Sequence, residues 1–203
     1  MKKLLLLFFS GFTFISQAQL VDTLPNVYRI DGEHGNMWAY LITMMQQSGR
    51  DSIPHVDSTY TYSLIIPKWY TVRETNEKNI LGGTFPALNN IQSALIFKSF
   101  LRKFEIRSFE DFENWVILET QMGKHPTWSN THIILEKNED DLFSDIGKAY
   151  RVKMERLGFF YRCEYILVET SKSYVWIDFT SPDESFDEDL LKLKEILKTF
   201  KKF

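Results

Sequence analysis

The sequence predicts an α+β fold, in which a single twisted antiparallel sheet of about six or seven strands carries helices packed on its faces. Two observations lead to this prediction. Several segments rich in β-branched and aromatic residues follow one another across short turns, and short turns favour antiparallel pairing. Three other segments place apolar residues at helical spacing, so each can bury one face against the sheet. A chain of 203 residues is long enough to do this as one domain.

The start of the chain has the order of a secretory signal peptide. Residues 1–18 read MKKLLLLFFSGFTFISQA, where two lysines precede a largely apolar stretch and small residues lead to a cleavage point between Ala18 and Gln19. The apolar stretch is shorter than the roughly 20 residues that a membrane-spanning helix needs. We therefore expect a bacterial protein of the periplasm or the medium, with no membrane span after signal removal.

Residues 19–59 are predicted to form an N-terminal lead-in with one short amphipathic helix near residues 37–47. Residues 50–59 are mostly polar and contain Pro54, so we expect them to be a loop. The α+β domain itself is predicted to span residues 60–203.

This domain is predicted to begin with a strand at residues 60–67, which ends at Pro67 because proline has no amide hydrogen for a strand ladder. Residues 71–74 are the expected hairpin partner of this strand. Residues 76–93 indicate a long connection, and the Gly-Gly-Thr run at 82–84 within it is expected to be a turn, because it lacks the lysine of a phosphate-binding loop. Further strands are expected at residues 94–100, 131–137, 149–155, 159–169 and 174–180.

Two helices have recognisable starts. Ser108 can cap the first by accepting a hydrogen bond from the amide of Asp111. The second is predicted to begin near Phe186, where Ser185 and Glu188 have the spacing of a capping box.

The stretch around this second start holds a cluster of carboxylates, which would suit a metal site, a catalytic pair or the start of a helix. We favour the helix start, because the amide hydrogens and the dipole at a helix N-terminus stabilise negative charge. The glycine and glutamate that an EF-hand calcium loop needs are missing. The five carboxylates are Asp183, Glu184, Asp187, Glu188 and Asp189.

No catalytic or metal-binding pattern stands out, so we predict no catalytic residue, no metal ligand and no cofactor. His34, His55, His125 and His132 are widely spaced and lack the close pairs of zinc sites, so surface positions are expected. His125 and His132 flank a turn-rich loop, where they could approach each other. Cys163 is the only cysteine, which excludes an internal disulfide, and we expect it to be buried and inert.

Charge and aromatic residues bear on the kind of partner. The net charge of −3 becomes −5 without the two lysines of the signal peptide, which does not favour nucleic acid. Trp69 and Trp128 lie in predicted loops, where such residues either anchor a ligand or cover an edge of the core. The expected partner is an unknown protein or a component of the cell envelope, and the residues that bind it remain unassigned.

The order of these elements resembles the PsbP-like fold. The resemblance is carried by YSLIIPKW at 62–69, ALIFKSF at 94–100, SFEDF at 108–112 and YVWIDFTSPDESFDEDLLKLKEILKTF at 174–200. The family includes an extrinsic photosystem subunit, a Ran-binding import factor and many small exported bacterial proteins. Its members are mostly accessory or binding proteins without shared catalytic residues, so the resemblance implies a fold and transfers no functional residue.

Three function hypotheses follow from the sequence. The first is an exported, non-enzymatic accessory or binding protein. The second is a small-ligand carrier with a pocket between the sheet and the loops at 76–93 or 121–128. The third is a hydrolase with a scattered site that includes His125 or His132.

Overall fold

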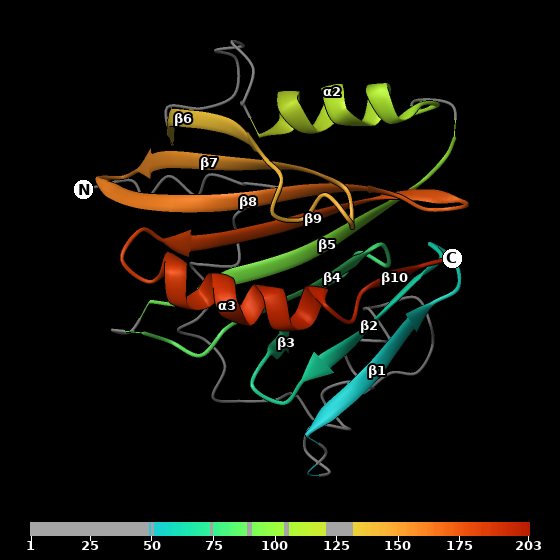
Figure 1. Cartoon of the computed structure of the whole chain (residues 1–203), viewed down its shortest axis with the longest axis horizontal. Coiled ribbons are helices and arrows are strands. Elements are labelled where there is room, and N and C mark those ends of the chain that lie inside the picture. The colour runs from blue at the N-terminus through green and yellow to red at the C-terminus, as the bar shows by residue number, and fades with distance from the viewer. Residues whose placement is uncertain (1–48, 50, 74, 89–90, 104–105, 121–131) are drawn as a thin grey trace, which may run out of the picture. The chain divides into compact units, whose positions relative to one another are not determined.

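Two antiparallel sheets make up the fold of the described residues, which are 49, 51–73, 75–88, 91–103, 106–120 and 132–203 of the computed structural model (Figure 1). The larger sheet has seven strands in the order β3-β4-β5-β9-β8-β7-β6, and the smaller has three in the order β1-β2-β10. The elements in chain order are β1 (Ser52–Asp57), β2 (Tyr62–Pro67), β3 (Thr71–Arg73), β4 (Ile80–Thr84), β5 (Ala94–Leu101), α2 (Phe109–Glu119), β6 (Ile133–Asp140), β7 (Lys148–Arg156), β8 (Phe159–Glu169), β9 (Ser173–Pro182), α3 (Phe186–Leu197) and β10 (Lys201–Lys202).

The α+β class is as predicted, but the strands form two sheets and not a single one. The strands expected from residue 94 onwards are confirmed as β5 to β9, each within a few residues of its expected bounds. The signal peptide expected at residues 1–18 and the helix expected near 37–47 lie outside the described residues.

The smaller sheet contains a strand where we expected a loop. β1 pairs with β2 along its whole length. Pro54 is compatible with this pairing because β1 is an edge strand, where an amide hydrogen is not required. Alternation along β1 buries Ile53, His55 and Asp57, so His55 is a core residue and not the surface histidine that we expected.

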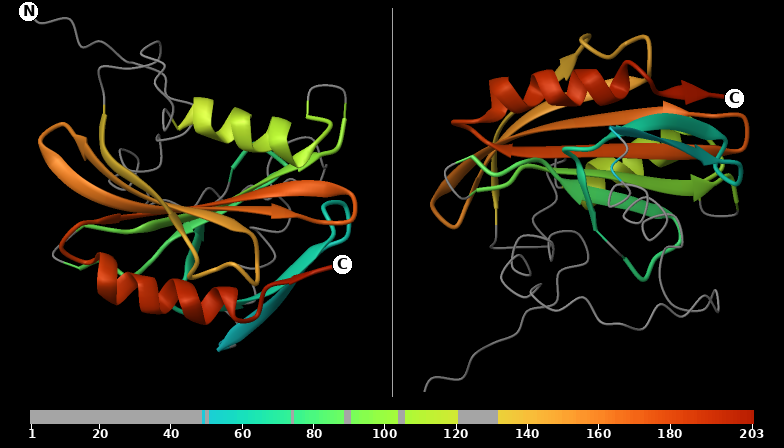
Figure 2. Two further views of the ribbon diagram at one scale, coloured as in Figure 1. Left: turned by 45° about the horizontal axis from the view of Figure 1, so that its top comes forward. Right: turned by 90° about the horizontal axis from the view of Figure 1, so that it is seen from below.

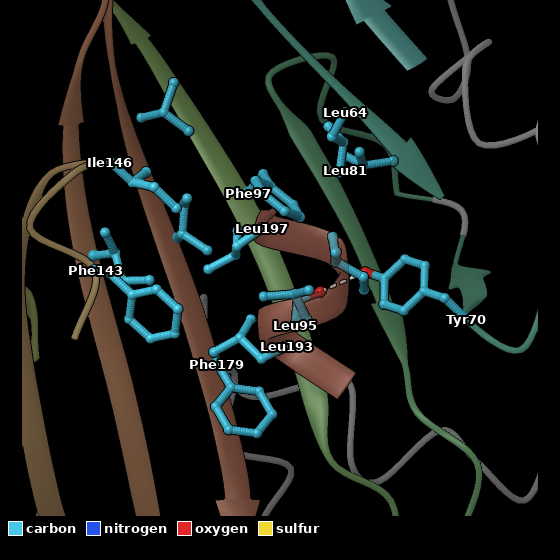
Figure 3. Packing of buried hydrophobic residues seen from close by; sticks show 14 of the residues in the cluster. Leu64, Tyr70, Leu81, Leu95, Phe97, Phe143, Ile146, Phe179, Leu193 and Leu197 are labelled. Atoms are coloured by element: carbon cyan, nitrogen blue, oxygen red, sulfur yellow. Dashed lines mark hydrogen bonds between the residues drawn. The ribbon is translucent and has the colours of Figure 1, made fainter. Parts of the chain in front are cut away.

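The chain crosses from the smaller to the larger sheet at Tyr70. β3 pairs with β4, so the predicted hairpin between residues 60–67 and 71–74 is wrong. A turn in which the Tyr70 amide donates to the Pro67 carbonyl, at 3.1 Å, separates the two strands. The buried Tyr70 hydroxyl donates a hydrogen bond to the Leu95 carbonyl, 2.6 Å away (Figure 3). This bond fixes the crossover against the larger sheet.

β4 runs through the Gly-Gly-Thr sequence that we expected to be a turn. The two glycines differ in the space around them. A Cβ atom on Gly83 would lie 2.3 Å from the Thr71 carbonyl oxygen and 2.7 Å from the ring of Tyr70. A Cβ atom on Gly82 would meet nothing nearer than an Ile96 carbon at 3.6 Å. Gly83 therefore allows the Tyr70 ring to close on the sheet.

The central strand β9 separates two buried clusters, since its side chains alternate between the faces of the sheet. On one face, the ring of Phe112 from α2 stacks on Tyr174, with centroids 5.1 Å apart. On the other face, Phe186 from α3 contacts Phe179, with centroids 5.7 Å apart, and joins a core that also includes residues of the smaller sheet. Figure 2 shows the two helices on opposite sides of the larger sheet.

The two predicted helix caps have different outcomes. The box at Ser108 is confirmed: its hydroxyl accepts from the Asp111 amide, and the Asp111 carboxylate accepts from the Ser108 amide, both at 3.0 Å. The box at Ser185 is wrong, because Ser185 makes no side-chain capping bond. Its backbone is helical and not extended (φ −103°, ψ −4°), and its hydroxyl lies 3.1 Å from the hydroxyl of Ser181.

β7 and β8 are joined by a two-residue turn, because Arg156 pairs with Phe159. Both turn residues have positive φ, 52° at Leu157 and 82° at Gly158, as in a type I′ hairpin turn. Asn, Asp and Gly suit the first position of this turn, and a leucine there is strained. We call Leu157, Gly158, Phe159 and Phe160 the hairpin tip.

Leu157→Asn should therefore stabilise the protein by about 1 kcal/mol, because asparagine tolerates positive φ better than leucine does. The urea unfolding midpoint at constant m measures this gain. Leu191→Asn in α3, another exposed leucine, is the control and should lower stability by a few tenths of a kcal/mol, as expected for asparagine in a helix. A midpoint for Leu157→Asn at or below that of the wild type would contradict the strain argument.

Gly83→Ala should destabilise the protein by about 2 kcal/mol or more, because the added methyl would overlap the Thr71 carbonyl and the Tyr70 ring. Gly82→Ala is the matched control on the neighbouring residue, and its methyl meets only ordinary contacts. Thermal unfolding of the two variants provides the comparison. Equal losses of stability would show that close packing at Gly83 is not the constraint.

Candidate functional site

Charged side chains gather on the outer strands of the larger sheet, on the face that α3 packs against. The register places Lys153 of β7 between Glu136 of β6 and Arg162 of β8. The neighbouring row places Arg151 of β7 opposite Glu164 of β8. Side chains in such rows are close neighbours, so they form one charged surface.

An open hollow of about 270 Å³ lies on this surface, and we call it the outer-strand hollow. Three strands and the turn before α3 contribute to it, and its lining is polar. The lining residues are Glu136, Asn138, Arg151, Lys153, Arg162 and Asp183.

Arg162 is the centre of the ion pairs around the hollow. Its Nε lies 2.6 Å from the Asp183 carboxylate, and its Nη1 lies 3.0 Å from the Asp187 carboxylate. Lys153 Nζ reaches Asp183 from the neighbouring strand, at 3.3 Å. The carboxylates at the start of α3 therefore tie the helix to β7 and β8.

Arg151 bridges two carboxylates on the other side of the hollow. It lies 2.6 Å from Asp140 and 3.0 Å from Glu164. Glu164 is fully buried, and its Oε1 has no hydrogen-bond partner among the described residues. Burial raises the pKa of Glu164 to about 7, although Arg151 opposes this shift.

A buried aromatic ring supports both arginines. The Phe186 ring lies 4.4 Å from the guanidinium carbon of Arg162 and 5.5 Å from that of Arg151. Both distances are within the range of cation–π attraction. Together with the carboxylates, this ring holds both guanidinium groups in fixed positions at the hollow.

The remaining carboxylates of the acidic cluster have other roles. Glu188 and Asp189 both pair with Lys192, at 3.0 and 2.7 Å. Buried Asp189 also accepts a hydrogen bond from the Ser93 hydroxyl, and Glu184 is exposed. Three of the five carboxylates lie in the first turn of α3, as the helix-start interpretation predicts. The pair of Glu188 with Lys192 follows from the i,i+4 spacing in the sequence, whereas the partners Arg162 and Ser93 come from other elements and were not foreseen.

The histidines that the structure describes lie away from the hollow. His55 contacts the Tyr62 ring, with centroids 5.7 Å apart, and burial lowers its pKa to about 4. His132 is half-buried, and its Nε2 lies 3.4 Å from the Thr120 carbonyl at the end of α2. His34 and His125 lie outside the described residues, so the approach of His125 to His132 stays a prediction.

Cys163 is buried as predicted, and Trp69 covers an edge of the core, which is one of the two roles predicted for it. Cys163 is buried, and burial raises the pKa of its thiol to about 12, which disfavours the reactive thiolate. Trp69 packs its ring edge against Phe85, with centroids 5.2 Å apart, and thus covers an edge of the core. Trp128, Ala18 and Gln19 lie outside the described residues.

The raised pKa of Glu164 predicts a measurable dependence of stability on pH. Between about pH 4.5 and about pH 7 the folded state keeps a proton that the unfolded state releases, so stability falls as pH rises. Gln in place of Glu164 cannot titrate. The unfolding free energy of Glu164→Gln relative to the wild type should therefore increase by up to about 3 kcal/mol across this window.

Urea unfolding of both proteins at the two ends of the window measures this difference. His55 contributes in the opposite direction, because its lowered pKa makes stability rise with pH between about 4 and about 6.5. The His55 contribution is common to both proteins and cancels in the difference. A difference that stays constant across the window would contradict the assigned environment of Glu164.

No model of a known protein family matches the sequence, and no curated protein matches it. Three similar solved structures are a protein from Bacteroides thetaiotaomicron, a protein of unknown function from Pseudomonas aeruginosa and PsbP from the cyanobacterium Synechocystis. Their identities are 9%, 9% and 8%, with TM-scores of 0.42, 0.43 and 0.43. The matches cover 76%, 72% and 75% of this chain and 49%, 93% and 93% of the others, so this chain spans about half the length of the Bacteroides protein. A PsbP is thus among the structures to which the chain is similar, as the resemblance in the sequence predicts.

Proposed function

We propose that the protein is an exported, non-enzymatic accessory protein that binds a partner protein through the outer-strand hollow. The single observation that carries this proposal is the convergence of three basic side chains, each already paired with a carboxylate, on one open hollow. The export part of the proposal rests on the signal-peptide pattern of residues 1–18.

Fixed ion pairs of this kind suit recognition. The guanidinium groups of Arg151 and Arg162 are held by carboxylates and by the ring of Phe186, so little side-chain freedom is left to lose on binding. Their remaining N–H groups can donate to a partner in a set geometry. A pattern of both signs also rejects partners whose charges do not match it.

The position of the hollow favours a large partner over a buried small molecule. β6 is an edge strand of the larger sheet, and most of its residues are exposed. Small-molecule pockets are predominantly apolar, whereas the lining here is charged or amide-bearing. A partner would therefore place one or two polar side chains in the hollow and spread over the exposed strand beside it.

A charge exchange within the hollow tests this proposal. Glu136 and Lys153 are direct cross-strand neighbours, so Glu136→Lys combined with Lys153→Glu keeps opposite charges side by side and reverses the pattern that a partner meets. The exchange also places a carboxylate beside Asp183 in place of its ion pair with Lys153, so we expect it to cost about 1 kcal/mol of stability and to abolish capture of the partner. The measurement is a quantitative crosslinking pull-down from envelope extract, with wild type and variant in parallel.

The matched control exchanges Glu195 of α3 and Lys198, the residue that caps the end of α3; both are exposed and away from the lining of the hollow. Glu195→Lys with Lys198→Glu should capture the same proteins as the wild type. If the exchange at Glu136 and Lys153 captured the wild-type set in the wild-type amount, the hollow would not be the binding site.

A small zwitterionic ligand is the second candidate, since the hollow approaches the lower end of the roughly 300–1,000 Å³ range of ligand pockets and carries both charges. Calorimetric titration with amino acids and dipeptides tests it. Heat that persists after the exchange of Glu136 and Lys153 would place any such binding elsewhere.

A further inference from the structure

The hairpin tip exposes large apolar side chains at one end of the larger sheet. Leu157 is 77% exposed, Phe159 61% and Phe160 50%. Ile133, at the start of the neighbouring strand β6, is 62% exposed. In Figure 2 the orange β7–β8 hairpin projects at the end of the sheet. Contiguous exposed apolar surface of this kind marks interaction sites in soluble proteins.

Exposed apolar side chains project on both faces of the tip, and Arg156 and Glu155 lie in the same rows as Phe159 and Phe160. Phe160 shares its strand face with Arg162 and therefore points to the side of α3, as Ile133 does through its register with Glu155. Phe159 points to the opposite side, and Leu157 stands at the end of the turn. A docking patch for a flat protein surface needs only one apolar face. A projection with exposed apolar side chains on both faces suits insertion into an apolar medium.

Leu157 also departs from what the turn requires. Its positive φ costs stability, and an exposed side chain gains no packing in return. Folding alone does not explain a leucine at this position, because asparagine would suit the turn better. Strained residues of this kind are often part of a functional site.

We propose that the hairpin tip inserts into the surface layer of a lipid bilayer. The exposed side chains of the tip, with Ile133, offer roughly 400–500 Å², which is less than the roughly 800 Å² per partner of a standard protein interface. Insertion of the turn and of the first residue pair, Arg156 with Phe159, would reach about 7 Å deep, within the roughly 5–10 Å of elements that lie in a membrane interface. The long side chain of Arg156 can return its charge to the headgroups. The structure therefore favours a lipid surface over a second protein for this element.

The charges behind the tip indicate which lipid. Arg156 and Glu155 lie in the rows of Phe159 and Phe160, and Lys153 and Glu136 lie in the row of Arg162. With Asp183, which pairs with Lys153 and Arg162, these are three acidic and three basic groups. Such a ring matches the paired phosphate and ammonium of a zwitterionic headgroup, and it gives no excess positive charge for anionic lipid. Among the described residues no helix is long and apolar enough to cross a membrane, so the tip would hold the protein at the surface.

Flotation with neutral phosphatidylcholine vesicles tests the proposal on the protein purified after export. The wild type should float with the vesicles, and Leu157→Asn should reduce the partition coefficient roughly tenfold. The double variant Phe159→Ser and Phe160→Ser should remove binding to the limit of detection. Because Leu157→Asn is expected to improve the turn, its loss of binding cannot be assigned to unfolding.

The controls separate this inference from the function proposed above. Leu191→Asn removes an exposed leucine from α3 and should float as the wild type does. The exchange of Glu136 and Lys153 should also float normally, so the two proposals can fail separately. Three results would overturn the inference: wild type that stays with the unbound protein, tip variants that float as well as the wild type, or binding that requires anionic lipid and disappears at about 0.5 M salt.

Discussion

Burial of β9 on both faces is the constraint on which the rest of the fold depends. This strand lies at the centre of the larger sheet, between β5 and β8, and nine of its ten residues are buried. A strand in that position needs cover on both sides, and α2 and α3 contact it from opposite faces. Even its buried carboxylate, Asp178, is compensated by Lys98, 3.5 Å away, which lies over the ring of Trp176. Isolated burial of that charge would be costly.

The outer strands of the larger sheet carry the charged side chains that its buried centre largely excludes. Along the α3 face, the row of Ile177, Ile166 and Ala149 is apolar. The following rows bring in Glu164 and Arg151, and then Arg162 and Lys153, as the surface moves away from the core. Because α3 begins at this boundary, its first-turn carboxylates meet those cations directly. The hollow is therefore a consequence of where the helix starts relative to the sheet, and its charges are balanced by the same geometry.

The sequence predicts the features that depend on residues close together in the chain, and it misses those that depend on residues far apart. The strands from residue 94 onwards were predictable, because their alternation and turns are local. β1 was missed because Pro54 indicates a loop unless the strand is known to lie at the edge of a sheet. β4 was missed because the reason for a glycine at position 83 is the close approach of the Tyr70 ring, which the sequence does not show. The cap at Ser108 follows a local rule, whereas Ser185 makes its hydrogen bond to Ser181 on β9. The site could not be predicted, because Lys153 and Asp183 converge only through strand register and the position of α3.

Two departures from local rules lie close to the two proposed binding surfaces. Leu157 has a backbone conformation that leucine disfavours, and Glu164 is a buried acid with an oxygen that lacks a partner among the described residues. Both lie on the β7–β8 hairpin, and both reduce stability where a different residue would not. Natural proteins tend to depart from such rules at functional sites and to compensate elsewhere. Here the compensation is the doubly covered β9, which gives the sheet enough buried surface to support a strained, charged and partly apolar outer end. The central strand thus provides stability, and the outer hairpin is left to make contacts. This is the physical basis for proposing that the β7–β8 hairpin takes part both in partner binding at the hollow and in lipid binding at the tip.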